Sequence, residues 1–183
     1  MKDGKYELND ITIVPLTRLY NVGDFDCGDD DLNEFLKIDS FVYQEKKLAS
    51  TVLIIEKERV IGFFSLCCDA IKLLDDEKQD CGISNKKPVK EYPAVKIARL
   101  AVDKNCQKKH LGTHCIQIAI GLIRDKLSGY IGCRFITVDS YYNKVIWYSK
   151  FKFLINEHSK YKSKDDYVSM RLDLLNPNPK NNS

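Results

Sequence analysis

The sequence has no apolar run that approaches the roughly 20 residues of a membrane-spanning helix, and its polar start, Met-Lys-Asp-Gly-Lys, is not that of a signal peptide. Positive and negative charges nearly balance, with 29 Lys and Arg against 26 Asp and Glu, and the basic residues are scattered. No two of the seven cysteines have CxxC spacing. We therefore expect a cytoplasmic protein with reduced thiols, no membrane association and no dedicated nucleic-acid face.

A chain of 183 residues fits one domain that can bury a core without disulfides. We predict a single domain over residues 1–175. Residues 176–183, Asn-Pro-Asn-Pro-Lys-Asn-Asn-Ser, are polar and interrupted by proline, which predicts a flexible C-terminal tail. There are no internal repeats.

Hydrophobic periodicity predicts alternating strands and helices. The expected elements are, in chain order, a strand at 11–16, a helix that starts after the acidic residues 29–31, a short helix at 41–48, a hairpin of strands 51–55 and 60–68 around a turn at 56–59, a surface loop at 73–92, a strand at 95–102, a helix at about 111–127, a strand at 135–138, a short helix at 144–151 and a strand at 167–174. This order predicts a mixed α+β fold with one strand-to-helix crossover at its centre.

The crossover joins Ala98-Arg99-Leu100-Ala101-Val102 to a helix that starts near Leu111. A strand, a short polar loop and a helix start with free N–H groups together form an anion site. The nearby lysines 104, 108 and 109 add positive charge, and Gly112 permits close approach of a ligand to the backbone. The alternative is an ordinary strand-to-helix turn.

At these residues the sequence resembles the GCN5-related N-acetyltransferase (GNAT) superfamily, whose signature Q/R-x-x-G-x-G/A follows a strand of the form R-L-A-V. The resemblance implies acetyl-CoA as cofactor and a mixed, mostly antiparallel central sheet flanked by helices. It implies that the main chain of Leu100, Ala101 and Val102 pairs with the pantetheine arm. The remaining residues that it places around the pyrophosphate are Gln107, Lys108, Lys109, His110, Leu111, Gly112 and Thr113.

The first glycine of the signature is His110 in this chain. Backbone donors do not require glycine, so the cradle can form if this residue has ordinary helical φ. His110 and His114 have i, i+4 spacing, but Leu111 stands where an H-E-x-x-H motif has Glu, and no third ligand is evident. We therefore expect no metal site.

The segment from Asn143 to Phe153 resembles the family pattern N-x-x-A-x-x-F-Y-x-x-x-G-F, with Lys152 in place of its glycine. The resemblance implies that Tyr148 is the general acid and that Asn143 contacts the pantetheine or phosphate arm. A thiol has a pKa of about 8.5 and a phenol of about 10, so tyrosine stays protonated and can donate to a departing thiolate. The alternative is a core aromatic residue on an amphipathic helix.

The implied reaction is acetyl transfer to a primary amine by direct attack on the thioester. Asp139 and Glu91 are candidates for a group near the amine. Substrate choice is expected in residues 24–50 and 73–92. There, Phe25-Asp26-Cys27-Gly28 resembles the opening of a subgroup that includes toxins acetylating aminoacyl-tRNA. The acceptor stays open between a small molecule, a protein and aminoacyl-tRNA. A non-catalytic CoA-binding or partner-binding domain is the other class, and the sequence carries no signal for an oligomeric state.

Overall fold

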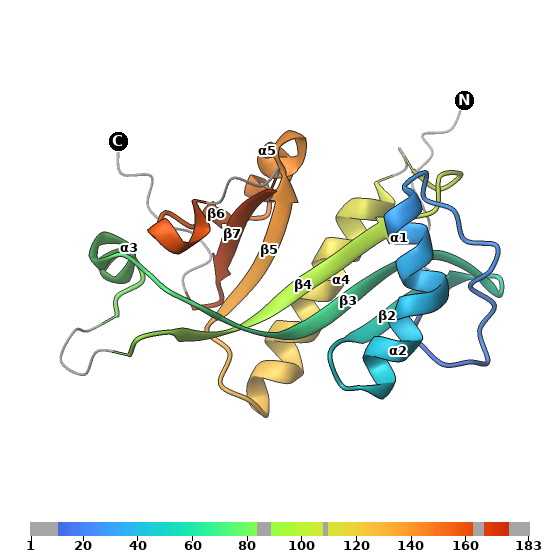
Figure 1. Cartoon of the computed structure of the whole chain (residues 1–183), viewed down its shortest axis with the longest axis horizontal. Coiled ribbons are helices and arrows are strands. Elements are labelled where there is room, and N and C mark those ends of the chain that lie inside the picture. Colours follow the sequence, from blue (N-terminus) through green and yellow to red (C-terminus); the bar gives the residue numbers. More distant parts are fainter. Residues whose placement is uncertain (1–10, 84–88, 108–109, 163–166, 176–183) are drawn as a thin grey trace. The chain divides into compact units, whose positions relative to one another are not determined.

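The computed structural model describes residues 11–83, 89–107, 110–162 and 167–175 (Figure 1). Its strands are β1 (Ile11–Pro15), β2 (Ser50–Glu56), β3 (Arg59–Ile71), β4 (Tyr92–Val102), β5 (Phe135–Tyr141), β6 (Leu154–Ile155) and β7 (Tyr167–Asp173). Its α-helices are α1 (Asp30–Glu34), α2 (Ser40–Glu45), α3 (Asp75–Asp80), α4 (Leu111–Asp125) and α5 (Val145–Ser149). A π-helical segment, η2 (Phe35–Asp39), joins α1 to α2, and the 3₁₀ segments are η3 (Leu127–Gly129), η4 (Tyr142–Lys144) and η5 (Ser159–Tyr161).

The strands form one sheet in the order β1-β2-β3-β4-β5-β7-β6. Strand β1 pairs antiparallel with β2, and β2 with β3. Strand β4 pairs parallel with β5, whereas β7 pairs antiparallel with both β5 and β6. The sheet is therefore mixed and mostly antiparallel, with helices around it, as predicted.

Contacts divide the chain into two compact units. Unit 1 comprises residues 1–67 and 97–121, and unit 2 comprises residues 68–96 and 122–183. Strands β3 and β4 and helix α4 each contribute residues to both units. One domain over residues 1–175 stays a prediction, and the predicted tail at 176–183 lies outside the described residues.

In unit 1, residues of opposite strand parity face different helices. Leu53 of β2 and Phe63 of β3 belong to the cluster that buries Phe35 and Leu36 of the helical run. The neighbouring residue Gly62 of β3 faces the opposite side of the sheet. A Cβ built at Gly62 would lie 3.3 Å from the Sγ of Cys115 in α4. The missing side chain therefore allows α4 to pack closely against the sheet, and this fixes the start of the helix relative to β4.

The helical run after β1 differs from the prediction of two separate helices. Residues 30–45 are helical without a break, and the middle five form the π-helical segment η2. The run starts where the acidic cluster predicted it, because the Asp29 carboxylate accepts a hydrogen bond from the Leu32 amide at 3.1 Å. Ser40 Oγ, buried in the run, donates to the Leu36 carbonyl at 2.6 Å.

Unit 2 contains a helix where the sequence predicted only a loop. Residues 73–92 include α3, and the buried Glu77 at its centre accepts a hydrogen bond from the Leu74 amide at 2.7 Å. The Arg171 guanidinium of β7 lies 2.5 Å from the other carboxylate oxygen of Glu77. The loop prediction was therefore wrong for residues 75–80, since a long-range ion pair organises this segment.

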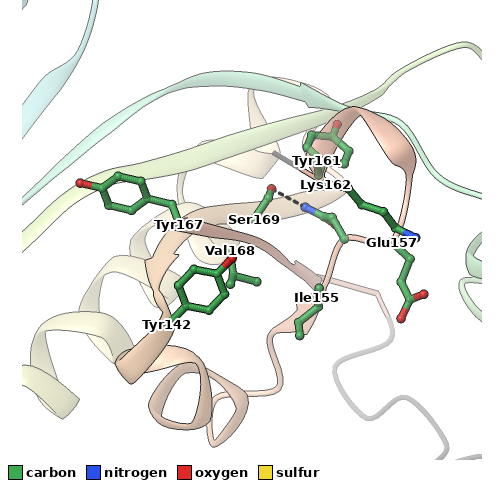
Figure 2. A pocket seen from close by; sticks show the side chains of 9 residues that line it. Tyr142, Ile155, Glu157, Tyr161, Lys162, Tyr167, Val168 and Ser169 are labelled. Atoms are coloured by element: carbon green, nitrogen blue, oxygen red, sulfur yellow. Dashed lines mark hydrogen bonds between the residues drawn. The ribbon is translucent and has the colours of Figure 1, made fainter. Parts of the chain in front are cut away.

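The short strand β6 was also missed by the sequence, because two residues are too few to show a period. It is held through pairing of Leu154 and Ile155 with β7. Directly after it, Asn156 Nδ2 donates to Ser169 Oγ of β7 at 2.8 Å (Figure 2). In the part of the chain that the structure describes, no helix is long and apolar enough to cross a membrane. No disulfide joins the seven cysteines, all of which lie in described segments.

Candidate functional site

The predicted cradle lies where β4 passes into α4, in unit 1. Ala101 and Val102 are buried at the end of β4, and Leu100 is half-buried. The register of β4 with β5 covers Ala94 to Lys96, so residues 100–102 lie beyond it on the same strand. Lys108 and Lys109, predicted to line the cradle, lie outside the described residues.

His110 adopts left-handed backbone, with φ of 60°. The ordinary helical φ under which the cradle could form without glycine is therefore not the conformation observed. The His110 carbonyl accepts the first intrahelical bond, from the His114 amide at 3.2 Å. The amides of Leu111, Gly112 and Thr113 therefore precede the first intrahelical donor and lack a partner within the helix. A left-handed residue beside helical ones turns successive N–H groups toward one point, which is the geometry of an anion-binding nest.

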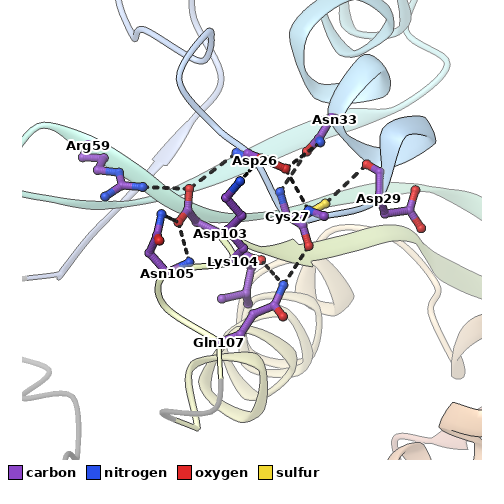
Figure 3. A network of polar contacts seen from close by, with 11 residues as sticks. Asp26, Cys27, Asp29, Asn33, Arg59, Asp103, Lys104, Asn105 and Gln107 are labelled. Atoms are coloured by element: carbon purple, nitrogen blue, oxygen red, sulfur yellow. Dashed lines mark hydrogen bonds and ion pairs between the residues drawn. The ribbon is translucent and has the colours of Figure 1, made fainter.

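The exposed Gln107 side chain holds the loop before the helix through two hydrogen bonds (Figure 3). Its Nε2 donates to the carbonyl oxygens of Val102 at 3.0 Å and Cys27 at 2.8 Å. The side chain of the signature glutamine therefore ties the end of β4 to the segment that precedes α1. No residue of the described segments accepts a hydrogen bond from its backbone amide.

Asp26 neutralises Lys104, which the sequence had assigned to the anion site. The two side chains form an ion pair at 2.5 Å, and the Lys104 amide also donates to the Asp26 carbonyl at 2.7 Å. The other oxygen of the Asp26 carboxylate accepts from Gly28 and Asn33. Lys104, then these donors, holds the pKa of Asp26 far below its usual range. The assignment of Lys104 to the anion site is therefore corrected, because its charge is compensated within unit 1.

Asp103, the residue after β4, is fully buried and accepts hydrogen bonds from several sides (Figure 3). Arg59 of β3 donates at 2.9 Å, and Asn105 donates through its amide at 2.9 Å and through Nδ2 at 3.1 Å. Burial would raise the pKa of Asp103, but the amides of Asn105 and Asp26 and the Arg59 guanidinium together lower it below its ordinary value. We call the set of Asp26, Asn33, Arg59, Asp103, Lys104, Asn105 and Gln107 the junction network.

Sequence reasoning missed the junction network as a unit. It interpreted residues 24–31 as a helix start and a substrate segment, and Asp103 as part of a polar loop. One local signal was present, since Asp followed two residues later by Asn favours an Asx turn. The links from Asp26 to Lys104 and from Cys27 to Gln107 span 78 and 80 residues, and no local pattern encodes them.

Tyr148 lies in α5, in unit 2, among other aromatic rings. Its ring centroid is 4.8 Å from that of Trp147 and 5.5 Å from that of Phe153, both in edge-on geometry. Burial raises the pKa of Tyr148 to about 12. That pKa keeps the phenol protonated at neutral pH. Among the described residues no hydrogen bond engages its hydroxyl group, so the hydroxyl hydrogen is available to a ligand.

Lys152, at the second signature glycine, is also left-handed, with φ of 70°. The Lys152 amide donates to the Ser149 carbonyl at 3.0 Å, and the Phe153 amide points to the Tyr148 carbonyl at 3.4 Å. These contacts are those of a Schellman cap, which ends the helical turn that carries Tyr148. Asn143, predicted to touch the cofactor, is exposed in η4, the 3₁₀ segment that directly precedes α5.

The two acidic candidates for a base are engaged in ion pairs. Asp139 pairs with Lys96, and Glu91 lies 3.5 Å from the Lys160 ammonium group. Within the described segments, no three His, Cys, Asp or Glu side chains gather as a metal ion would require. The structure therefore groups Leu100 to Val102, Gln107 and His110 to Thr113 in unit 1, and Asn143 and Tyr148 in unit 2.

No family model matches the sequence. Among solved structures, AtaT complexed with acetyl-methionyl-tRNAfMet is similar with a TM-score of 0.75 and 22% identity, over 90% of this chain and 95% of that chain. AtaTR bound with acetyl-CoA gives a TM-score of 0.74 and 22% identity, over 93% and 97%. A KacT variant with one tyrosine changed to phenylalanine gives 0.76 and 18%, over 92% and 97%.

This chain has the GNAT fold. The match with AtaT extends over 90% of this chain. Within the GNAT fold of this chain, both signature glycine positions keep left-handed backbone although neither is glycine. The fold therefore requires that conformation at His110 and Lys152 strongly enough to impose it on residues with a side chain.

Proposed function

We propose that the protein is a cytoplasmic N-acetyltransferase that transfers acetyl from acetyl-CoA to a primary amine, with Tyr148 as general acid. The observation that carries the proposal is the left-handed His110 at the start of α4, in a chain with the GNAT fold. That conformation supports a nest of amides for the pyrophosphate, which is the one feature that a generic strand-to-helix turn does not need.

The cofactor would be held by main-chain groups from Leu100 to Val102 and by the amides around residues 107–113. Helix N-termini favour negative charge, and a pyrophosphate needs several N–H donors rather than one lysine. The compensation of Lys104 by Asp26 is consistent with this, since the cradle then depends on dipoles fixed by the fold. His110 is exposed, so its imidazole can add one donor from the side.

Tyr148 would donate a proton to the sulfur of CoA as it leaves. The amine nitrogen attacks the thioester carbonyl carbon, the carbon–sulfur bond breaks, and the sulfur takes the electron pair. Tyr148 donates its hydroxyl hydrogen bond to that sulfur and supplies the proton, the extra proton on nitrogen leaves to solvent, and the Tyr148 phenolate regains a proton from solvent. A phenol whose pKa is about 12 stays protonated until charge develops on the sulfur. An α-amine, with a pKa of about 7.7 to 8.0, has enough neutral form at pH 7 to react without a dedicated base.

The test is thiol release from acetyl-CoA in the presence of a panel of amines. Tyr148→Phe should lower kcat by roughly 10²- to 10⁴-fold with little change in KM for acetyl-CoA, because only the hydroxyl is removed. Tyr130→Phe is the matched control, since Tyr130 is 91% exposed at the C-cap of η3. Cofactor binding without turnover by the unchanged protein would favour the non-catalytic class, and equal turnover of both variants would remove Tyr148 from the reaction.

A second, narrower function is acetylation of the α-amine of aminoacyl-tRNA by a toxin. Three observations favour it: one similar structure is AtaT with acetyl-methionyl-tRNAfMet, another is a tyrosine-to-phenylalanine AtaT toxin bound to the C-terminus of the antitoxin AtaR and acetyl-CoA, and residues 25–28 resemble the opening of such toxins. Expression of the chain should then arrest growth, and Tyr148→Phe should relieve the arrest. Harmless expression of the active enzyme would exclude this function and leave other amines.

A further inference from the structure

A pocket of about 280 Å³ lies in unit 2, and none of the residues assigned to the cofactor lines it (Figure 2). Its wall includes Tyr142 of η4, Tyr161 of η5 and Tyr167 of β7, together with Lys162 and Glu157. We call it the tyrosine pocket. Three phenols line this small opening, and two of them, Tyr142 and Tyr167, are exposed.

Two of the rings are exposed, and two are held in place by contacts. Tyr142 is 64% exposed and Tyr167 is 45% exposed. The Tyr167 ring packs on Tyr141 with centroids 4.9 Å apart, and the Tyr161 hydroxyl accepts a hydrogen bond from the Lys72 amide at 2.9 Å. Rings that are already ordered lose little conformational entropy when a flat ligand stacks on them.

The charges that the described residues place near the rings are those of three lysines and two glutamates. Lys162 lines the pocket, Lys144 follows Tyr142 by two residues, and Lys160 Nζ lies 5.5 Å from the centroid of the Tyr161 ring. The acidic groups that face them are Glu157, which lines the pocket, and Glu91, which is 3.5 Å from Lys160. Lys144 and Lys162 make no ion pair with any residue in the described ranges, so both are available to an anion.

The floor of the pocket carries polar groups in fixed positions. Asn156 is buried, and it donates through Nδ2 to Ser169 Oγ while its Oδ1 accepts from Arg171 at 3.1 Å. Ser169 Oγ is thereby an acceptor for Asn156, which leaves its own hydroxyl hydrogen for a ligand. With the Glu157 carboxylate as an acceptor, the pocket can hydrogen-bond the edge of a base.

We propose that the tyrosine pocket binds an unpaired nucleotide at the 3′ end of an RNA, with the base against the tyrosines and the phosphates on Lys162 and Lys144. Rings, lysines and a single donor–acceptor pair match a base with its phosphate. A purely cationic ligand would be repelled by the lysines, and a purely anionic one would leave the rings unused. The proposal rests on the proposed function in one respect, since it names the acceptor as the aminoacyl end of an RNA.

The experiment measures the affinity of the full chain for deacylated tRNA labelled at its 5′ end, by fluorescence anisotropy. Tyr142→Ala and Tyr167→Ala should each weaken binding on the order of tenfold, because each removes one stacking surface. Tyr142→Phe, which keeps the ring, and Tyr130→Ala, an exposed tyrosine outside the pocket, should bind like the unchanged protein. A tRNA without its unpaired 3′ nucleotides should not distinguish Tyr142→Ala from the unchanged protein.

Lys162→Ala gives an independent readout, because it should reduce the slope of log affinity against log salt by about 0.7 to 0.9 for each phosphate that the lysine neutralises in the unchanged protein. Affinity for acetyl-CoA should be the same in all these variants. Equal tRNA binding by Tyr142→Ala and Tyr130→Ala would overturn the proposal, as would absence of tRNA binding in a protein that acetylates other amines. Tyrosine-dependent tRNA binding without any acetyl transfer would support the pocket and overturn the proposed function instead.

Discussion

Each unit contains one extensive polar network, and the two differ in what surrounds them. The junction network of unit 1 is partly open to solvent, with the Arg59 and Lys104 side chains about half exposed. The network of unit 2 is closed: the side chains of Arg171 and Glu77 are 5% and 8% exposed. Polar groups in the first network fix a loop that is proposed to hold a ligand, whereas those in the second replace part of a hydrophobic core. The difference predicts that the first affects cofactor binding and the second affects stability.

The largest effect is expected in unit 2. Glu77→Ala leaves the buried Arg171 guanidinium without its charged partner, which should lower the free energy of unfolding by about 3 to 5 kcal/mol. Denaturant unfolding measures it. Arg18→Ala, which removes the exposed pair with Glu45, is the matched control and should have little effect. The double variant Glu77→Leu with Arg171→Met should recover much of the stability, and if it did not, the pair would contribute more than its burial explains.

In unit 1, Asp103→Ala should cost less stability, about 1 to 3 kcal/mol, because Arg59 can be solvated when its partner is removed. The same change should weaken acetyl-CoA binding, since it releases the loop between β4 and α4. Calorimetric titration with acetyl-CoA measures this effect, and Asp103→Asn should retain part of the affinity. If Glu77→Gln weakened cofactor binding as much as Asp103→Asn, the contrast between the two networks would disappear.

Low pH should reduce the free energy of unfolding through one carboxyl group in each unit. Asp103 in unit 1 and Asp173 in unit 2 have folded pKa values below their ordinary value of 3.8. For Asp173, burial raises the pKa, but the Arg134 guanidinium and the Leu175 amide together lower the pKa by more than burial raises it. The unfolded chain then binds more protons as the pH falls below about 4, so the free energy of unfolding should decrease there. The stability difference between the unchanged protein and Asp173→Asn should shrink from pH 6 to pH 2, and a constant difference would contradict the assignment.

The smallest effects concern the two left-handed residues. His110→Gly and Lys152→Gly each relieve a side chain of positive φ, and each should stabilise the fold by roughly 0.5 to 1 kcal/mol after the greater flexibility of glycine is counted. Gly82 is the natural comparison, since it ends α3 with φ of 65° and the same cap. Only His110→Gly should also change affinity for acetyl-CoA. An equal change in Lys152→Gly would mean that the effect acts through general stability.

Elements with a strong period were predictable from the sequence. Strands β2 to β5 and helix α4 were predicted close to their observed bounds, and so was the helix that carries Tyr148. The hairpin turn was placed correctly at Lys57 and Glu58, although both have positive φ without glycine or asparagine to signal it.

The rest depends on contacts between distant residues. Helix α3 is stabilised by a pair 94 residues apart in sequence, and β6 is defined by its partner strand. The left-handed conformation of His110 could not be predicted, because histidine adopts it only when the surrounding fold requires it. For the same reason the residue types of the cradle were visible in the sequence while its geometry was not.

The π-helical segment at Phe35–Asp39 has an evolutionary consequence. Such a turn is the expected product of a one-residue insertion into an ordinary α-helix. Deleting one residue there would restore regular α-helical winding and, because the π turn absorbs the extra residue, would leave the downstream helix α2 in nearly its present orientation. Phe41, which packs against the buried cluster of unit 1, would therefore keep its place, so this segment can lose one residue although it lies inside a helix.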